Sequence, residues 1–169
     1  MDLKVVIIGG LLGALVLAGG LLLYNSDTAP RLDGEITQVR TLGMDQRSSV
    51  AIVNFDAING SDNLLIIARR DLLVVDQYGT ERSGSTISIS DLKYLFDLYP
   101  ALGGMGFEPL ADRVRVESGG PLRGILAARF DLPKHELDQR RAIIFRTEDV
   151  DGKQSDLRLE SEPRPVEKQ

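Results

Sequence analysis

The chain has 169 residues, a formal net charge of −5 at pH 7 and no cysteine. The absence of cysteine excludes disulfides, cysteine nucleophiles and cysteine metal ligands. Because lysine and arginine are spread along the chain without a basic block, the composition gives no footprint of nucleic-acid binding.

Residues 5–23 form a run of 19 uncharged, mostly apolar residues. As a helix this run would be about 30 Å long, the thickness of a bilayer core, and it carries no polar stripe of the kind a soluble core helix shows. A cleaved signal peptide is the alternative, since Lys4 supplies a short positive region, but the run exceeds the usual apolar length of ~7–15 residues in a signal. The sequence therefore predicts a single transmembrane anchor over residues 1–24.

Small residues in this run recur at helical spacing. Such stripes let helix backbones approach closely in lipid, which predicts packing against another membrane protein or a second copy of the chain. The alternative is that glycine and alanine are simply common in membrane helices. The candidate packing residues are Gly9, Gly13 and Gly20 on one face and Gly10, Ala14 and Ala18 beside them.

Charges around the anchor are nearly balanced between its two ends. Lys4 favours an inside N-terminus, which predicts a single-pass protein of the cell membrane with an extracytoplasmic C-terminal part, periplasmic in a bacterium. Residues 25–33 are predicted to be a linker, and the proline-rich, charged residues 161–169 a disordered tail.

Residues 34–160 are predicted to form one β-rich domain. The stretch 48–59 is apolar on both parities, which indicates a central strand covered on both faces. The stretch 64–79 predicts one long or two short strands, and Ile87 and Ile89 alternate with serine and threonine, which predicts a half-buried strand over 85–90. Further strands are predicted over residues 34–42, 113–118, 123–132, 140–150 and 156–160, with one or two helical turns over 133–139.

The period changes to that of a helix over residues 90–100. Ser90 is the predicted N-cap, Asp91 suits the first turn, and Pro100 ends the run. The helix is predicted to pack on the sheet or to close one end of it. Its apolar face is predicted to contain Leu92, Leu95, Phe96 and Tyr99.

A glycine-rich loop, residues 101–109, follows this helix. It lacks the lysine and serine or threonine of a phosphate-binding loop. Apolar groups on such a segment are one way to build a contact surface, the alternative being that they are buried in the core. The candidate protein-contact residues are Leu98, Tyr99, Met105 and Phe107.

No pattern predicts catalysis, a bound metal or a cofactor. His135 is the only histidine and lies in a polar stretch, so it is predicted to be a surface residue. The acidic stretch 149–156 resembles half of a calcium loop but lacks the full spacing, so a hairpin turn is predicted there. The arginine pairs at 68–70 and 139–141 are predicted to be solvated strand or helix ends.

Four stretches carry a family resemblance: VAIVNFDAINGSDN (50–63), LLVVDQYG (72–79), SGGPLRGILAARFDLP (118–133) and AIIFRTEDVDGK (142–153). They resemble the small immunoglobulin-like sandwiches found behind a single membrane helix, and are similar to the water-stress (WHy-type) late-embryogenesis-abundant domain. The resemblance implies an antiparallel immunoglobulin-like β-sandwich with a binding or structural role and no catalytic residues. The helix at 90–100 departs from the plain sandwich and is predicted to be an insertion.

These observations predict a non-catalytic, single-pass membrane protein whose β-sandwich binds another protein, as an accessory subunit of a membrane complex. The alternative is a free-standing envelope domain that binds a small or lipidic ligand in a cavity between its sheets.

Overall fold

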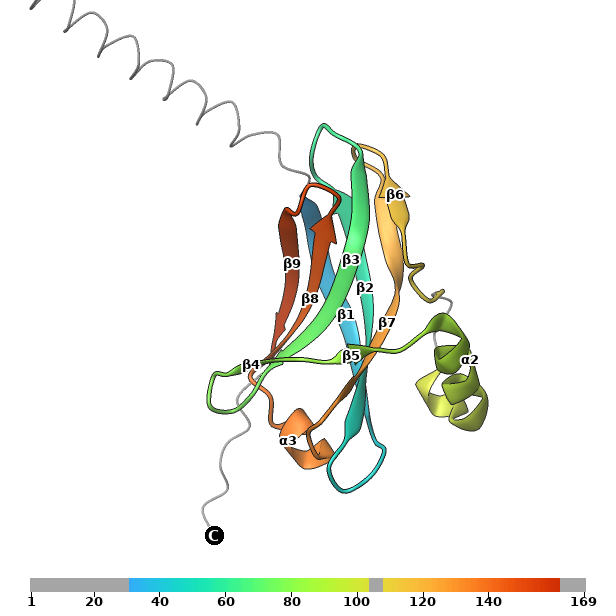
Figure 1. Ribbon diagram of the computed structural model, residues 1–169, viewed down its shortest axis with the longest axis vertical. Helices are drawn as coiled ribbons and strands as arrows, with labels where there is room; N and C mark the ends of the chain where they lie inside the picture. Colours follow the sequence, from blue (N-terminus) through green and yellow to red (C-terminus); the bar gives the residue numbers. More distant parts are fainter. Residues whose placement is uncertain (1–30, 104–107, 162–169) are drawn as a thin grey trace, which may run out of the picture.

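The computed structural model describes residues 31–103 and 108–161. In these ranges the chain is mainly β, with strands paired in antiparallel sheets and few helices (Figure 1). The strands are β1 (Leu32–Gly43), β2 (Ser49–Asn59), β3 (Leu65–Val75), β4 (Glu81–Ser83), β5 (Ser85–Thr86), β6 (Val114–Val116), β7 (Pro121–Phe130), β8 (Ala142–Asp149) and β9 (Gln154–Glu160). The helices are α2 (Ile89–Leu98), the 3₁₀-helix η1 (Pro100–Leu102) and α3 (Lys134–Asp138).

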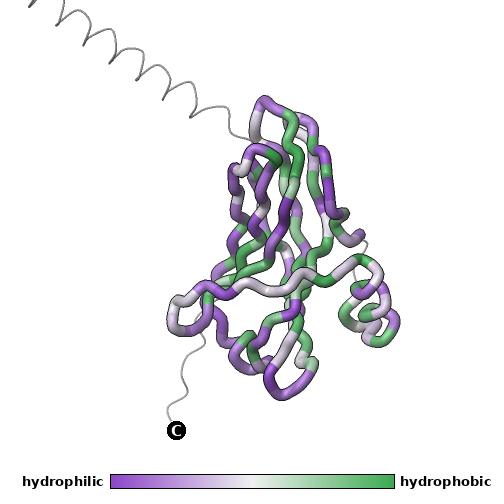
Figure 2. The backbone as a smooth tube through the Cα atoms, viewed as in Figure 1, coloured by the Kyte–Doolittle hydropathy of each residue, from purple (hydrophilic) through white to green (hydrophobic). Residues whose placement is uncertain are grey.

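The strands form two sheets. The first sheet has the order β1-β2-β7-β5, and the second has the order β4-β3-β8-β9, with β6 also paired to β3. Hydrophobic residues follow the long strands of both sheets (Figure 2). Neighbours such as β2 and β7 are far apart in the sequence, so the sheets are built by long-range pairing.

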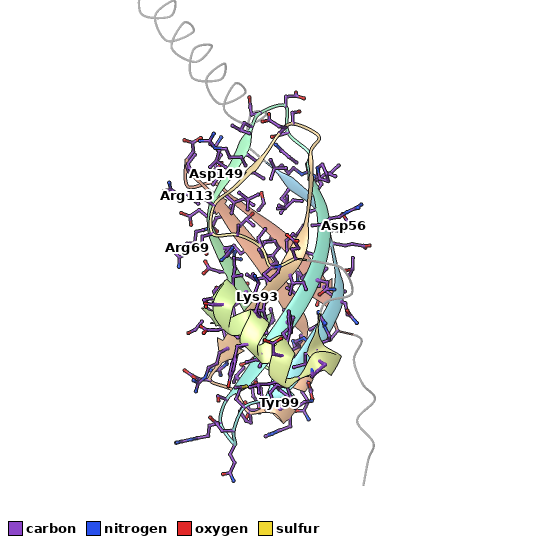
Figure 3. All side chains as sticks on the ribbon, turned by 90° about the vertical axis from the view of Figure 1, so that its right-hand side faces the viewer. Asp56, Arg69, Lys93, Tyr99, Arg113 and Asp149 are labelled. Carbon is purple, nitrogen blue, oxygen red and sulfur yellow. The ribbon has the colours of Figure 1, made fainter. Side chains whose placement is uncertain are left out.

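β2 is covered on both faces, which explains its two apolar parities. Val53 and Phe55 belong to the core cluster shared by the two sheets. Val50 and Ile52 face the other way and pack in a second cluster with α2, which lies across the first sheet (Figure 3). The prediction of a central strand over 48–59 is confirmed.

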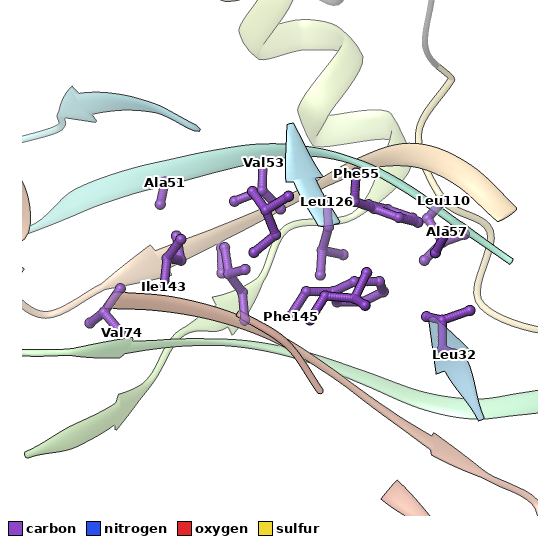
Figure 4. Close-up of a cluster of buried hydrophobic side chains, with 14 of the residues drawn as sticks. Leu32, Ala51, Val53, Phe55, Ala57, Val74, Leu110, Leu126, Ile143 and Phe145 are labelled. Carbon is purple, nitrogen blue, oxygen red and sulfur yellow. The ribbon is translucent and has the colours of Figure 1, made fainter. Parts of the chain in front are cut away.

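The main core contains side chains from both sheets (Figure 4). Phe55 of β2 and Phe145 of β8 are fully buried, and their ring centroids lie 4.5 Å apart at an interplanar angle of 40°. Such tilted aromatic pairs add to the stabilisation that comes from burial alone. Around them the core is filled by leucine, isoleucine and valine.

Two segments cross from one sheet to the other on the same side of the fold. Residues 81–86 pair first with β3 as β4 and then with β7 as β5. At the crossing, a Cβ on Gly84 would lie 2.7 Å from the Phe130 ring, so only glycine passes there without displacing the core. Residues 108–116 cross back: the amide of Leu110 donates to the carbonyl of Ile125 in β7 (2.9 Å), and β6 then pairs with β3.

Two hairpins close with the same Asp-x-x-Gly turn. In residues 76–80 the Asp76 carboxylate accepts hydrogen bonds from the backbone amides of Tyr78 and Thr80. In residues 149–153 the Asp149 carboxylate accepts them from the amides two and four residues further on, at 2.8 Å each. The glycines of the two turns have φ of 89° and 79°, the left-handed region that favours glycine.

The prediction of a strand over 85–90 is wrong beyond its first two residues. β5 ends at Thr86, and α2 begins at Ile89 with Ser88, not Ser90, as its N-cap. The Ser88 hydroxyl accepts a hydrogen bond from the amide of Asp91 (3.1 Å). Serine side chains compete with strand pairing in this way, and here the local cap decides the structure.

The remaining strand predictions agree with the structure in outline. The stretch 64–79 forms the single strand β3, which ends before the Asp76 turn, and the first strand begins at Leu32 instead of residue 34. The edge strand β4 was not predicted, because its residues are polar and exposed. The predicted anchor (1–24), most of the predicted linker (25–33) and of the tail (161–169) lie outside the described residues.

Candidate protein-binding surface on the inserted helix

α2 forms because its ends carry residues that cap and stop a helix and its inner face is apolar. Ser88 caps the N-terminus, Asp91 lies in the first turn, and Pro100 begins η1 directly after the C-cap residue. Leu92 and Leu95 are buried against the outer face of the first sheet. Their neighbours there are Val50, Ile52, Ile125 and Ala127.

The outer side of α2 exposes large apolar side chains. Tyr94 is 65 % exposed, Leu98 56 % and Tyr99 45 %. Tyr94 and Leu98 are four residues apart and therefore neighbours on one helix face. These three residues are termed the α2 surface.

Sequence reasoning found two of its three members. Leu98 and Tyr99 were predicted contact residues, although Tyr99 was also placed on the packed face and is instead half exposed at the C-cap. Tyr94 was missed, and its spacing of four residues from Leu98 could have indicated it. Met105 and Phe107 lie outside the described residues.

Arg40 of β1 anchors the C-terminal side of the helical insertion. Its guanidinium donates to the carbonyls of Leu102 and of Gly103, the latter at 2.7 Å, and to the Asn54 side chain at 2.5 Å. Burial lowers the pKa of this guanidinium, and its Nε is buried without a partner among the described residues. The guanidinium therefore loses hydration on burial, and the hydrogen bonds that replace this hydration fix the position of η1 on the first sheet.

Arg70 of β3 anchors the chain on the other side of the insertion. Its side chain is only 8 % exposed, and it donates to the carbonyl of Leu110 and to the carboxylate of Asp112. The prediction that residues 68–70 form a solvated strand end is wrong for Arg70. Its partners lie 40 and 42 residues along the chain, where no local pattern could reveal them.

The two arginines come from different sheets and hold the chain just before and just after residues 104–107. The position of α2 on the first sheet is thus fixed by its apolar inner face and by the hydrogen bonds of Arg40 to Leu102 and Gly103, directly after it. A surface held in this way loses little conformational freedom when a partner binds.

An open pocket of ≈ 370 Å³ lies beside the N-terminus of α2, at the side of the fold where the two crossing segments meet β3. Its lining is mostly polar, and it is separate from the core between the sheets. The lining residues are Ala68, Arg69, Arg70, Thr86, Ile87, Ser88 and Asp112.

The histidine and the acidic stretch that the sequence analysis considered as possible sites lie on the surface and in a hairpin turn. His135 is exposed in α3, as predicted. Residues 149–153 close the β8–β9 hairpin, and Asp156 pairs with Arg146 at 2.7 Å, which confirms the hairpin-turn interpretation. Among residues 31–103 and 108–161, no group of three or more histidine, cysteine or carboxylate side chains is placed to hold a metal ion.

No protein-family model matches the chain, and no curated protein sequence matches it significantly. The similarity to the WHy-type domain therefore stays a prediction. None of the helices in the described part of the chain is long and apolar enough to cross a bilayer. The six predicted helix-packing residues, Gly9, Gly10, Gly13, Ala14, Ala18 and Gly20, lie outside the described residues.

Proposed function

We propose that this protein is a non-catalytic, single-pass membrane protein whose extracytoplasmic domain binds another protein through the α2 surface, as an accessory subunit of a membrane complex. The membrane part of the proposal is supported by the 19 uncharged residues of 5–23 and by their stripes of small residues. The binding part is supported by α2.

The domain is proposed to be an immunoglobulin-like β-sandwich. In constant-type immunoglobulin domains the sheets have the strand orders ABED and CFG. The first sheet here, β1-β2-β7-β5, has the ABED order when the strands are lettered along the chain. The second, β4-β3-β8-β9, has the CFG order with one extra edge strand, and α2 and β6 then form an insertion between strands D and E.

The observation that carries the binding proposal is the two-sided character of α2. Its inner face is buried in the fold, while Tyr94, Leu98 and Tyr99 remain exposed on its outer side. Tyrosine is enriched among the residues that dominate protein interfaces, because it brings a large apolar area and a polar group at little entropic cost. The packing of Leu92 and Leu95 on the first sheet and the hydrogen bonds of Arg40 just after the helix keep this area in one orientation.

We favour protein binding over the ligand-binding alternative because that alternative needs an apolar cavity between the sheets. The described core there is closed by packed aromatic and branched side chains, with Phe55 and Phe145 in direct contact. The pocket beside α2 is open and mostly polar.

The test is a pull-down of the tagged full-length chain from native membranes in mild detergent, with mass spectrometry of the co-purified proteins. A stoichiometric partner is expected. The variant Tyr94→Ala with Leu98→Asp should reduce its recovery roughly tenfold or more, the loss expected at an interface hot spot. The matched control is Tyr78→Ala, which removes an aromatic side chain 81 % exposed in the distant 76–80 turn.

The outcomes separate the parts of the proposal. Unchanged recovery with the α2 variant would show that the partner binds elsewhere. Recovery of the chain alone would remove the accessory-subunit proposal. Replacing Gly9 and Gly13 by isoleucine tests helix packing separately, because retention of the same partner by that variant would exclude the small-residue stripe as the contact.

A further inference from the structure

One end of the fold is built from the start of β1 and the loops around it. The carbonyl of Arg31 accepts from the amide of Gly60 (2.8 Å), and the amide of Asn59 donates to the carbonyl of Gly120 (3.0 Å). The amide of Val150 reaches the start of β3 (3.1 Å). This end, made of residues 31–33, 58–66, 115–121 and 149–155, is termed the tether end, and it lies at the top of Figure 1.

The loops of the tether end are held firmly. The buried side chain of Asn59 donates to the carbonyls of Asn63 (2.7 Å) and Val116 (3.0 Å), and its oxygen accepts from the amide of Ser61 (3.1 Å). The side chains carried by these loops are therefore presented in defined positions.

Three of these side chains are exposed and aliphatic. Ile58 is 48 % exposed, Leu64 40 % and Val150 56 %. The turn geometry does not require an apolar residue at Val150, because the matching turn at residues 76–80 carries Gln77 in the same position. Among the described residues, the other exposed branched aliphatic side chains are Leu98, on the α2 surface, and Leu159.

The tether end carries a small net negative charge. Arg31 pairs with Asp33 at 2.7 Å. The other charged residues there are Arg115 and Lys153, against Asp62, Glu117, Asp149 and Asp151, so its charged side chains sum to −2. A surface with this mixture of signs has no concentrated charge of one sign that would attract a strongly charged partner.

The length of the sequence between the apolar run and Arg31 indicates which end of the fold lies closest to the membrane. Residues 24–30 join the apolar run to Arg31, and seven residues reach at most about 25 Å. β1 alone has 12 residues and extends roughly 40 Å from the tether end, so the opposite end stands further away than the connection can reach. If residues 5–23 span a bilayer, the tether end is the part of the fold closest to the lipid.

We propose that the tether end rests on the bilayer surface, with Leu64, Val150 and Ile58 in the interfacial region. This inference rests on the membrane anchor of the proposed function. The aliphatic side chains supply the apolar contact, and the charged side chains of both signs around them lie at headgroup level. Because the tether end has a small net negative charge, the contact is expected on zwitterionic lipid and is not expected to strengthen when anionic lipid is added.

The absence of cysteine allows a direct test with single labels. The full-length chain is reconstituted in phosphatidylcholine bilayers with an environment-sensitive fluorophore on Leu64→Cys or Val150→Cys. Matched controls are Met44→Cys and Tyr78→Cys, which are 51 % and 81 % exposed in turns at the opposite end. Labels at 64 and 150 should show blue-shifted emission and quenching by nitroxide lipids, and labels at 44 and 78 should show neither.

A second variant keeps the test independent of the labelled side chains. With the label on Asp62→Cys, the double change Leu64→Glu and Val150→Glu should reduce lipid quenching severalfold, while Tyr78→Glu should leave it unchanged. Equal quenching at all four label positions would overturn the inference.

Flotation with the vesicles separates this inference from the proposed function. If the chain does not float, the predicted membrane anchor is wrong, and both the proposed function and this inference are refuted. If it floats without lipid quenching at 64 and 150, only the lipid contact is wrong. Protection of these positions that arises only when a partner protein is added would reassign the tether end to that protein.

Discussion

Arg70 is predicted to hold the chain after the inserted loop mainly through a carbonyl and only weakly through its ion pair. Arg70→Met keeps the apolar stem but removes the donors to Leu110 and Asp112. Leu110 is buried at 6 % exposure, so its carbonyl loses a partner in a site poor in water, at a cost of about 1–3 kcal/mol. The Asp112 side chain is 93 % exposed, and an ion pair to such a group contributes below about 1 kcal/mol.

The matched variant is Asp112→Asn, which removes the counter-charge and leaves the carbonyl bond in place. Chemical denaturation of the full-length chain in detergent, followed by far-UV circular dichroism, should show a loss of about 1–3 kcal/mol for Arg70→Met and below about 1 kcal/mol for Asp112→Asn. Hydrogen exchange gives a local readout, because the amide of Leu110 donates to the carbonyl of Ile125 at 2.9 Å and should lose protection in Arg70→Met. Equal losses for the two variants, or unchanged protection of Leu110, would refute the reasoning.

Two further predictions concern the matching turns. The Thr80 amide, together with the Arg82 guanidinium and the Tyr78 amide, lowers the pKa of the Asp76 carboxyl in the folded protein. The stability that this carboxylate contributes is therefore fully present above its pKa in the unfolded chain, near pH ~4. It is lost as the pH falls through the lower pKa of the folded protein. Asp76→Asn should therefore lower the free energy of unfolding at neutral pH and flatten its acid dependence, as measured by denaturation at a series of pH values; an unchanged slope would contradict this. Gly152 has φ of 79° with open space around it, so Gly152→Ala should cost about 1–2 kcal/mol through backbone strain alone and Gly152→Asn less, and equal stability of both variants and the parent chain would exclude that strain.

The sequence predicts individual strands and helices better than it predicts which strands pair with each other. The apolar residues on both parities of 48–59 indicate a strand covered on both faces, and the structure supplies the core on one face and α2 on the other. Periodicity reports how one segment is buried but not which strand lies beside it. The crossing at residues 81–86 could not be predicted, because β4 has no apolar residue and its position is set by pairing with β3.

The same limit applies to the candidate site. Leu98 was predicted because apolar residues near a helix end are visible in the sequence. Arg40 and Arg70 were not predicted, since an arginine reads as solvated until its partners are known, and those partners lie between 14 and 63 residues away. Burying a guanidinium costs free energy unless carbonyl or carboxylate partners are in place, so these two positions depend on the complete fold.

The two proposed contacts constrain each other because the tether end and α2 both have fixed positions in the same fold. Tyr99, at the end of α2, lies toward the end of the fold opposite to Asp149 and the tether end (Figure 3). Leu92 and Leu95 pack α2 on the first sheet, and Arg40 of β1 holds the chain directly after it, so α2 cannot move toward the tether end without losing these contacts. With the tether end on the bilayer, a partner seated on the α2 surface would have to reach it with a part that stands clear of the lipid. A partner confined to the membrane could then contact this chain only through its helix, and the Gly9 and Gly13 variants and the α2 variant would separate the two kinds of partner.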